Sequence, residues 1–294
     1  MKNNTISPLR PQRRALFTPP LALAALFAAL ANTAFSAVTQ YVISKEERLN
    51  QTSTAAPVLD PTRPFRINAS VTVAAPADLS SNPTATAPAG GTGASPLTMT
   101  YNAGNADYEN KINFLSRAAL DASYLDGTYI MHMVSPVFGT KDVNLTLSPA
   151  SYSFPTDIPK LTNTSWAGGV LVLDATVSNT LVWNSFSQLA GNDFVQFGLN
   201  GTSVNVNQTG NLTSYVIAAN TLSIGNTYTG DIGFNHATTS DSASVAGATG
   251  LGGYGTGTRF SIQAIPEPAS CISLAVGACA LLARRRRQGH GCNA

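Results

Sequence analysis

The chain has 294 residues, of which 11% are charged and 44% are hydrophobic. A soluble domain typically carries about 25% charged residues, and here uncharged polar residues fill the difference. This composition excludes a polytopic membrane protein, a coiled coil and a charge-rich disordered chain. A net charge of +2 provides no face that could neutralise nucleic-acid phosphates, so no nucleic-acid partner is expected. The length allows one or two domains with cores of their own.

The charge is distributed unevenly along the chain. Residues 1–37 contain four basic and no acidic residues, and residues 265–294 contain four arginines and one glutamate. Residues 38–264 contain nine basic and fourteen acidic residues and are therefore acidic. Each basic terminal segment lies beside an apolar run, which is the pattern of membrane-targeting segments.

Residues 1–37 are predicted to be a signal peptide. Basic residues precede an apolar run at residues 21–30, and small residues follow it. Signal peptidase is expected to cut after Ser36, with cleavage after Ala37 as the alternative. The pair Arg13-Arg14 leaves the twin-arginine route open beside the general secretory route.

Residues 265–294 combine three features in order. Two prolines flank Glu267 and break regular structure. The charge-free run at 269–283 is predicted to form a short transmembrane helix. A basic cluster ends the run and marks its cytoplasmic side. This stop-transfer cluster consists of Arg284, Arg285, Arg286 and Arg287.

This order of features resembles the PEP-CTERM sorting signal of Gram-negative bacteria. The resemblance assigns the sorting motif to Pro266, Glu267 and Pro268. It implies processing by an exosortase after transient anchoring in the inner membrane. It also implies association with the cell envelope and with extracellular polysaccharide. The alternative is a plain tail anchor in which the Pro-Glu-Pro sequence is coincidental.

All three cysteines lie in the C-terminal segment, at Cys271, Cys279 and Cys292. The region expected to be exported therefore contains no disulfide, no catalytic cysteine and no thiolate metal site. Its stability has to come from its core.

Residues 62–264 are predicted to be all-β, because short β-branched or aromatic runs alternate with Gly, Pro, Asn and Asp clusters. One helical turn is expected within 115–125. Many short strands at this spacing are typical of antiparallel β-sandwiches. The strands are expected at residues 66–74, 97–101, 111–115, 127–134, 143–147, 169–174, 180–183, 193–199, 203–206, 214–219, 227–234 and 258–264.

The domain organisation follows from the same pattern. Residues 38–61 are expected to form a linker or an edge strand. Two sandwiches are expected at 62–150 and 151–264, and a single larger sandwich over 62–264 is the alternative.

Two stretches, 74–96 and 238–257, are rich in small residues, with proline in the first and glycine in the second. Both are expected to be flexible loops.

Two turns that contain tyrosine resemble the corner before strand F in known sandwich domains. Leu120–Tyr129 is similar to the immunoglobulin-like pattern, and Leu222–Thr229 is similar to the fibronectin type III pattern. In such folds the tyrosine hydroxyl bonds back to the preceding turn, a role that falls here to Tyr228. Trp183 is expected to lie in the core of the second domain.

No catalytic constellation is recognisable in the exported region. His132 is expected to face outward from a strand and His236 to lie in a turn, and their spacing is not that of a metal site. Turn preference explains the aspartates, although Ca²⁺ bound by turn aspartates and carbonyls remains an alternative. No cofactor is predicted. These aspartates are Asp126, Asp142, Asp157, Asp193 and Asp231.

Four aromatic residues lie near predicted loops: Tyr152, Phe154, Trp166 and Tyr254. If exposed they could stack on sugar rings, but we expect them to pack beneath the loops.

The sequence therefore favours an exported, non-enzymatic envelope or extracellular-matrix protein. Its expected partners are exosortase and signal peptidase during export, and exopolysaccharide or envelope proteins afterwards. The alternatives are a secreted all-β polysaccharide hydrolase or lyase and a carbohydrate-binding module. The discriminating feature is a deep cleft with converging carboxylates or histidines.

Overall fold

The computed structural model describes residues 37–148 and 153–267, which belong to one compact unit and are all-β. Several predicted features lie outside the described residues: Ser36, Pro268, the apolar run, the arginine cluster, the three cysteines and Tyr152.

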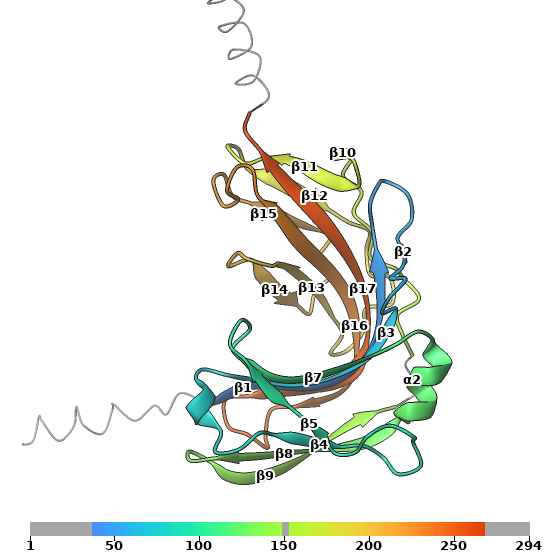
Figure 1. Cartoon of the computed structure of the whole chain (residues 1–294), viewed down its shortest axis with the longest axis vertical. Coiled ribbons are helices and arrows are strands. Elements are labelled where there is room, and N and C mark those ends of the chain that lie inside the picture. The colour runs from blue at the N-terminus through green and yellow to red at the C-terminus, as the bar shows by residue number, and fades with distance from the viewer. Residues whose placement is uncertain (1–36, 149–152, 268–294) are drawn as a thin grey trace, which may run out of the picture. The chain divides into compact units, whose positions relative to one another are not determined.

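Eleven strands within the described residues form the main sheet, whose central path runs β14-β13-β16-β17-β1-β3-β7-β6 (Figure 1). Neighbours along this path are antiparallel, except that β1 and β17 are parallel. The path strands are β1 (Val38–Asn50), β3 (Phe65–Val73), β6 (Thr100–Asn102), β7 (Asp107–Phe114), β13 (Phe194–Leu199), β14 (Asn205–Gln208), β16 (Thr227–Asp241) and β17 (Thr249–Ile265). The remaining strands of this sheet are β2 (Val58–Leu59), β10 (Trp166–Ala167) and β11 (Val170–Asp174).

Two smaller sheets complete the described part of the chain. A four-stranded sheet has the order β5-β4-β8-β9, and a two-stranded sheet pairs β12 with β15. Their strands are β4 (Thr84–Thr86), β5 (Leu97–Thr98), β8 (Gly127–Ser135), β9 (Gly139–Leu147), β12 (Asn179–Val182) and β15 (Ser214–Ile217). The helices are the short 3₁₀ helix η1 (Pro76–Asp78) and α2 (Arg117–Ser123), which begins at the N-cap Ser116.

The expectation that residues 38–61 form a linker or an edge strand is wrong for Val38–Asn50. This segment pairs with β17 on one side and β3 on the other, so it is an interior strand of the main sheet. Its residues alternate as an interior strand requires, because the side chains of Tyr41, Ile43 and Lys45 are fully buried on one face. The charges within 45–48 hid this alternation from the sequence pattern.

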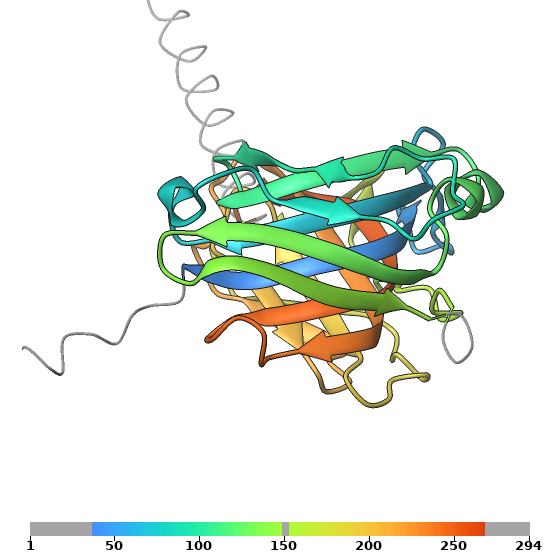
Figure 2. The ribbon, with the colours of Figure 1, turned by 90° about the horizontal axis from the view of Figure 1, so that it is seen from below.

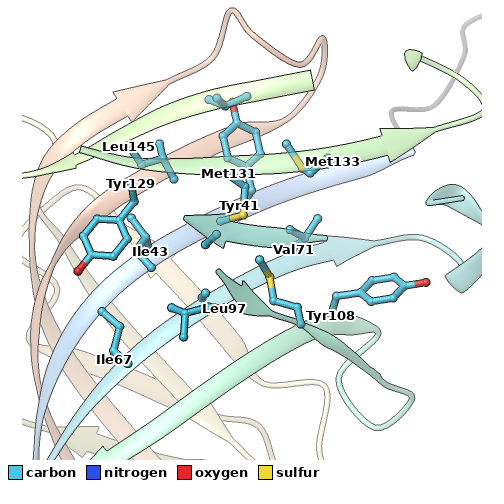
Figure 3. Packing of buried hydrophobic residues seen from close by; sticks show 14 of the residues in the cluster. Tyr41, Ile43, Ile67, Val71, Leu97, Tyr108, Tyr129, Met131, Met133 and Leu145 are labelled. Carbon is cyan, nitrogen blue, oxygen red and sulfur yellow. The ribbon is translucent and has the colours of Figure 1, made fainter. Parts of the chain in front are cut away.

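One face of the main sheet carries two buried clusters. The first cluster packs Tyr41 and Ile43 of β1 and Ile67 of β3 against residues of the four-stranded sheet, such as Met131 (Figure 3). In Figure 2 the light-green strands β8 and β9 lie across the blue β1. The second cluster packs β13, β16 and β17 against the two-stranded sheet, with Trp183 buried as predicted.

Strand β17 links the two clusters. Its residue Tyr254 belongs to the first cluster and Phe260 to the second. Between them, the buried hydroxyls of Thr256 and Thr258 donate to carbonyls of the segment that follows residue 152. Because β16 and β17 run continuously past both clusters, the two halves of the chain share one sheet.

The expectation of a flexible loop at 238–257 is wrong, because most of this stretch lies in β16 and β17. Close approach explains two of its glycines. A Cβ on Gly250 would lie 2.1 Å from the Tyr41 ring, and a Cβ on Gly253 would lie 2.1 Å from the His236 carbonyl oxygen. The other expected loop, 74–96, contains η1 and β4.

Both tyrosine-containing turns form hydrogen bonds within the corner. The Ser223 N–H donates to the Tyr228 hydroxyl at 2.8 Å, which confirms the predicted role of Tyr228. In the first turn, the Tyr129 hydroxyl donates to the Leu125 carbonyl at 2.8 Å. Each bond fixes the chain where it enters a long strand.

Candidate functional site

The face of the main sheet opposite the two buried clusters is polar and borders a cleft of about 870 Å³. We call it the polar face. On β1 it carries Ser44, Glu46 and Arg48, which alternate with the buried residues of that strand. Neighbouring strands contribute further polar side chains, including Asn68 of β3 and Asn235 of β16.

Glycines form the middle of the polar face. On β17, Gly255 lies between Glu46 of β1 and Asn235 of β16, and Gly257 lies between Arg48 and Gly233. The side-chain oxygen of Asn235 lies over Gly255, where a Cβ would come within 2.7 Å of it. The polar face is therefore recessed along this part of β17, and polar side chains of β1 and β16 flank it.

Several ion pairs lie on the polar face, one of them between Lys111 and Glu109 of β7. Arg66 contacts Glu46 at 2.5 Å, and Arg259 contacts Asp231 at 3.2 Å. Both carboxylates are thereby held by guanidinium groups.

Arg48 stands between these pairs and differs from both arginines. The residue is 9% exposed, yet among the described residues its guanidinium makes no hydrogen bond and no ion pair. Burial, together with the positive charges of Arg66 and Arg259, lowers the pKa of Arg48 to about 10. At neutral pH this side chain is an unpaired cation that faces the cleft.

Within residues 37–148 and 153–267, three buried side-chain polar atoms have no hydrogen-bond partner. They are Asn68 Oδ1, Asp107 Oδ1 and Asn235 Nδ2. All three residues line the cleft. Buried polar atoms are normally satisfied, so these atoms mark positions where a ligand or water can bind.

His236 does not lie in a turn, as expected, but is buried in β16. Its Nδ1 lies 2.7 Å from Asp193 Oδ2, and Phe186 packs against its ring. Asp193 also accepts hydrogen bonds from the N–H groups of Ala190 and Ala237. This pair ties the turn before β13 to β16, so its role in the fold is structural.

The two predicted histidines are not brought together as a site. His132 faces outward from β8, as expected, and its Nδ1 lies 2.6 Å from Asp142 Oδ1. In the described part of the chain, no three His, Cys, Asp or Glu residues are grouped closely enough to hold a metal ion.

The aromatic residues pack as expected wherever the structure describes them. Phe154 and Tyr254 are buried, with ring centroids 5.6 Å apart. Trp166 is half-buried and donates its indole N–H to the Asn163 carbonyl. None of these three rings offers an open stacking platform.

Sequence reasoning did not identify Arg48, Asn68 or Asn235. A signal was present, because every second residue from Ser44 to Asn50 is polar and glycine alternates at 253, 255 and 257. Such a strand has one polar and one buried face.

The structure places Ala37 buried just before β1 and Pro266 just after β17. Glu267 is exposed. Among residues 37–148 and 153–267, no helix has the length and apolar character needed to cross a membrane.

No family model and no curated protein matches this chain. Among solved structures, it is similar to the BSP domain of a biofilm-associated protein, with 14% identity over 79% of this chain and 30% of that chain, at a TM-score of 0.21. A bacterial ice-binding adhesin of 1.5 MDa is 12% identical over 78% of this chain and 66% of the other, at a TM-score of 0.25. The human OSCAR ligand-binding domain is 10% identical over 75% of this chain and 97% of the other, at a TM-score of 0.20. The chain thus spans under a third of the first structure and about two thirds of the second. These likenesses assign no function.

Proposed function

We propose that this protein is an exported, non-enzymatic component of the cell envelope or extracellular matrix of a Gram-negative bacterium. In this proposal an exosortase processes it at Pro266, Glu267 and Pro268, and it then associates with exopolysaccharide. The observation that carries the proposal is the order of the C-terminal features: a Pro-Glu-Pro motif, an apolar run and four arginines.

Two structural observations support this assignment. The last described strand, β17, ends at Ile265, and the motif starts with the next residue. The expected signal-peptide cleavage point likewise lies one or two residues before Val38, the first residue of β1. Removal of both terminal segments would leave every described strand intact.

The polar face supports binding over hydrolysis. Glycoside hydrolysis uses two carboxyl groups, one of which acts as a proton donor. Here Glu46 and Asp231 are each held in an ion pair with an arginine. A carbohydrate-binding module is therefore the second candidate, and a hydrolase or lyase has less support.

The sorting proposal is tested by replacing Pro266, Glu267 and Pro268 with alanine in the native host. Mass spectrometry of surface-extracted and membrane fractions reads both processing points. The wild-type protein should begin at Ala37 or Val38 and lack its C-terminal segment, whereas the variant should stay in the membrane with that segment attached. The same triple replacement at residues 288–290 is the control. Identical processing of the wild type, the Pro-Glu-Pro variant and the control would contradict the proposal.

A further inference from the structure

The strongest unexplained feature of the molecule is the unpaired cation of Arg48. A charged side chain is rarely buried without a partner, because burial removes its hydration. The neighbouring carboxylates compensate it only in part, since Glu46 attracts Arg48 without contact, and Glu46 and Asp231 contact Arg66 and Arg259 instead. An anion bound at the cleft would supply the missing partner.

Unpartnered hydrogen-bonding atoms lie along the same face. Asn68, which is 8% exposed, offers the acceptor Oδ1, and Asn235 offers the donor Nδ2. Asn68 of β3 pairs with Ser44 of β1. Asn235 of β16 pairs with Gly255 of β17, which in turn pairs with Glu46 of β1. Arg48 lies four residues from Ser44 on β1, a distance of about 13 Å at roughly 3.3 Å per residue.

These groups suit a ligand that bears both hydroxyls and carboxylates. A hydroxyl can donate to Asn68 Oδ1 and accept from Asn235 Nδ2, whereas a carboxylate can accept two parallel hydrogen bonds from a guanidinium. At Gly257 a ligand can approach the backbone of the sheet closely, because the atoms nearest to a Cβ there are backbone carbonyl oxygens at 3.7 and 4.0 Å. A cleft of about 870 Å³ lies within the size range of ligand pockets.

We propose that the polar face binds an acidic polysaccharide, with a uronic acid carboxylate on the Arg48 guanidinium and sugar hydroxyls on Asn68 and Asn235. This inference rests on the proposed association with exopolysaccharide and names its ligand class and site. It requires no stacking platform, because hydrogen bonds and one charge contact hold the sugar chain. An acidic peptide would also satisfy Arg48, so its binding is one of the outcomes that the test distinguishes.

The test is binding of the full chain, purified in a nonionic detergent, to polygalacturonate. Fully methyl-esterified polygalacturonate has the same backbone without the charge, and polyglutamate has the charge without the sugar. The wild type should bind polygalacturonate and bind both other polymers at least 10-fold more weakly. Arg48→Gln should weaken polygalacturonate binding by about 10- to 100-fold, the range for a hydrogen bond to a charged group.

Lys141→Gln is the matched control, because it removes one positive charge from β9 of the four-stranded sheet, away from the cleft. It should leave binding within 2-fold of the wild type. Arg48→Lys keeps the charge without the paired donors and should bind at an intermediate level. Arg48→Gln should melt at the wild-type temperature or above it, because it removes a buried charge that contacts no carboxylate among the described residues. A purely structural arginine would instead lower both stability and binding.

The inference is overturned if the wild type does not bind polygalacturonate, if Arg48→Gln binds as the wild type does, or if polyglutamate or the methyl ester binds equally well. These outcomes are independent of the sorting test. Failure of polygalacturonate binding with normal processing would remove only the ligand assignment. Binding with processing unaffected by the Pro-Glu-Pro replacement would remove only the sorting proposal.

Discussion

A single methyl group added at Gly253 tests whether the glycine-rich stretch is a close-packed strand. The Cβ of Gly253→Ala would lie 2.1 Å from the His236 carbonyl oxygen and 3.2 Å from the Cα of Ala237. An ordinary contact is 3.4 Å or more, so the two strands have to separate locally by about 1.3 Å. The obstacle is backbone, which cannot rotate away as a side chain can.

The cost has two parts. Overpacking in a close-packed interior costs about 1–3 kcal/mol, and one weakened ladder hydrogen bond adds about 1 kcal/mol. The free energy of unfolding should therefore fall by about 2–4 kcal/mol. In a chain of this size each kcal/mol moves the melting temperature by about 2–4 °C, so Tm should fall by about 4–16 °C.

Gly257→Ala is the matched control on the same strand. Its Cβ would lie no closer than 3.7 Å to any neighbour, and the residue has an ordinary backbone conformation. The substitution lowers the entropy of the unfolded chain, so stability should stay the same or rise by up to about 1 kcal/mol. Thermal unfolding of the full chain, followed by circular dichroism, compares the two variants. Equal melting temperatures would refute the close-packing explanation and favour the expectation that this stretch is a flexible loop.

Three further predictions concern the fold. The fully buried Lys45 forms ion pairs with Asp121 and Asp126. Replacing both carboxylates, in Asp121→Asn with Asp126→Asn, leaves the ammonium group unpaired and should lower the free energy of unfolding, measured in urea, by about 3–5 kcal/mol. Either single variant should cost less, because one ion pair at 2.7 or 2.8 Å survives. Tyr228→Phe removes the acceptor of the Ser223 N–H and should lower Tm by about 2–4 °C. The control is Tyr101→Phe, which should leave Tm unchanged because the Tyr101 hydroxyl has no hydrogen bond among the described residues. Equal effects of the two substitutions would contradict the role of the Tyr228 corner. Burial alone would raise the pKa of Asp60, but hydrogen bonds from Thr62 and the Arg63 N–H lower it to about 2. The ionised carboxylate therefore contributes about 2 kcal/mol of stability above pH 4, and this contribution is lost as pH falls toward 2. Asp60→Asn should flatten this part of the curve of unfolding free energy against pH.

The strand pattern of the exported region could be predicted because it is local. Runs such as 127–134 and 227–234 combine β-branched residues with turn residues at their ends, and the structure places strands β8 and β16 there. The helical turn within 115–125 corresponds to α2. The corner at Tyr228 was predictable for the same reason, since its hydrogen bond spans only five residues.

Long-range pairing could not be predicted in this way. The position of β1 depends on β17, whose sequence lies some two hundred residues away, and no property of 38–50 alone distinguishes an interior strand from an edge strand. Likewise, glycine in 250–257 lowers local strand propensity. Its reason becomes visible only when Tyr41 and the His236 carbonyl are placed against the same strand.

The polar face was hidden for a related reason. Sequence patterns detect the side of a strand that is buried against a core, and they leave the opposite side to solvent by default. Arg48 and Asn68 read as such solvent-facing residues, yet they are 9% and 8% exposed. Apolar packing does not account for this burial, because both residues lie on the face opposite the two hydrophobic clusters and line the cleft. A polar surface that is buried without being packed has lost water contacts, and among the described residues no protein group replaces them at Asn68 Oδ1 or Asn235 Nδ2. That cost is what a hydroxyl- and carboxylate-bearing ligand would offset on binding.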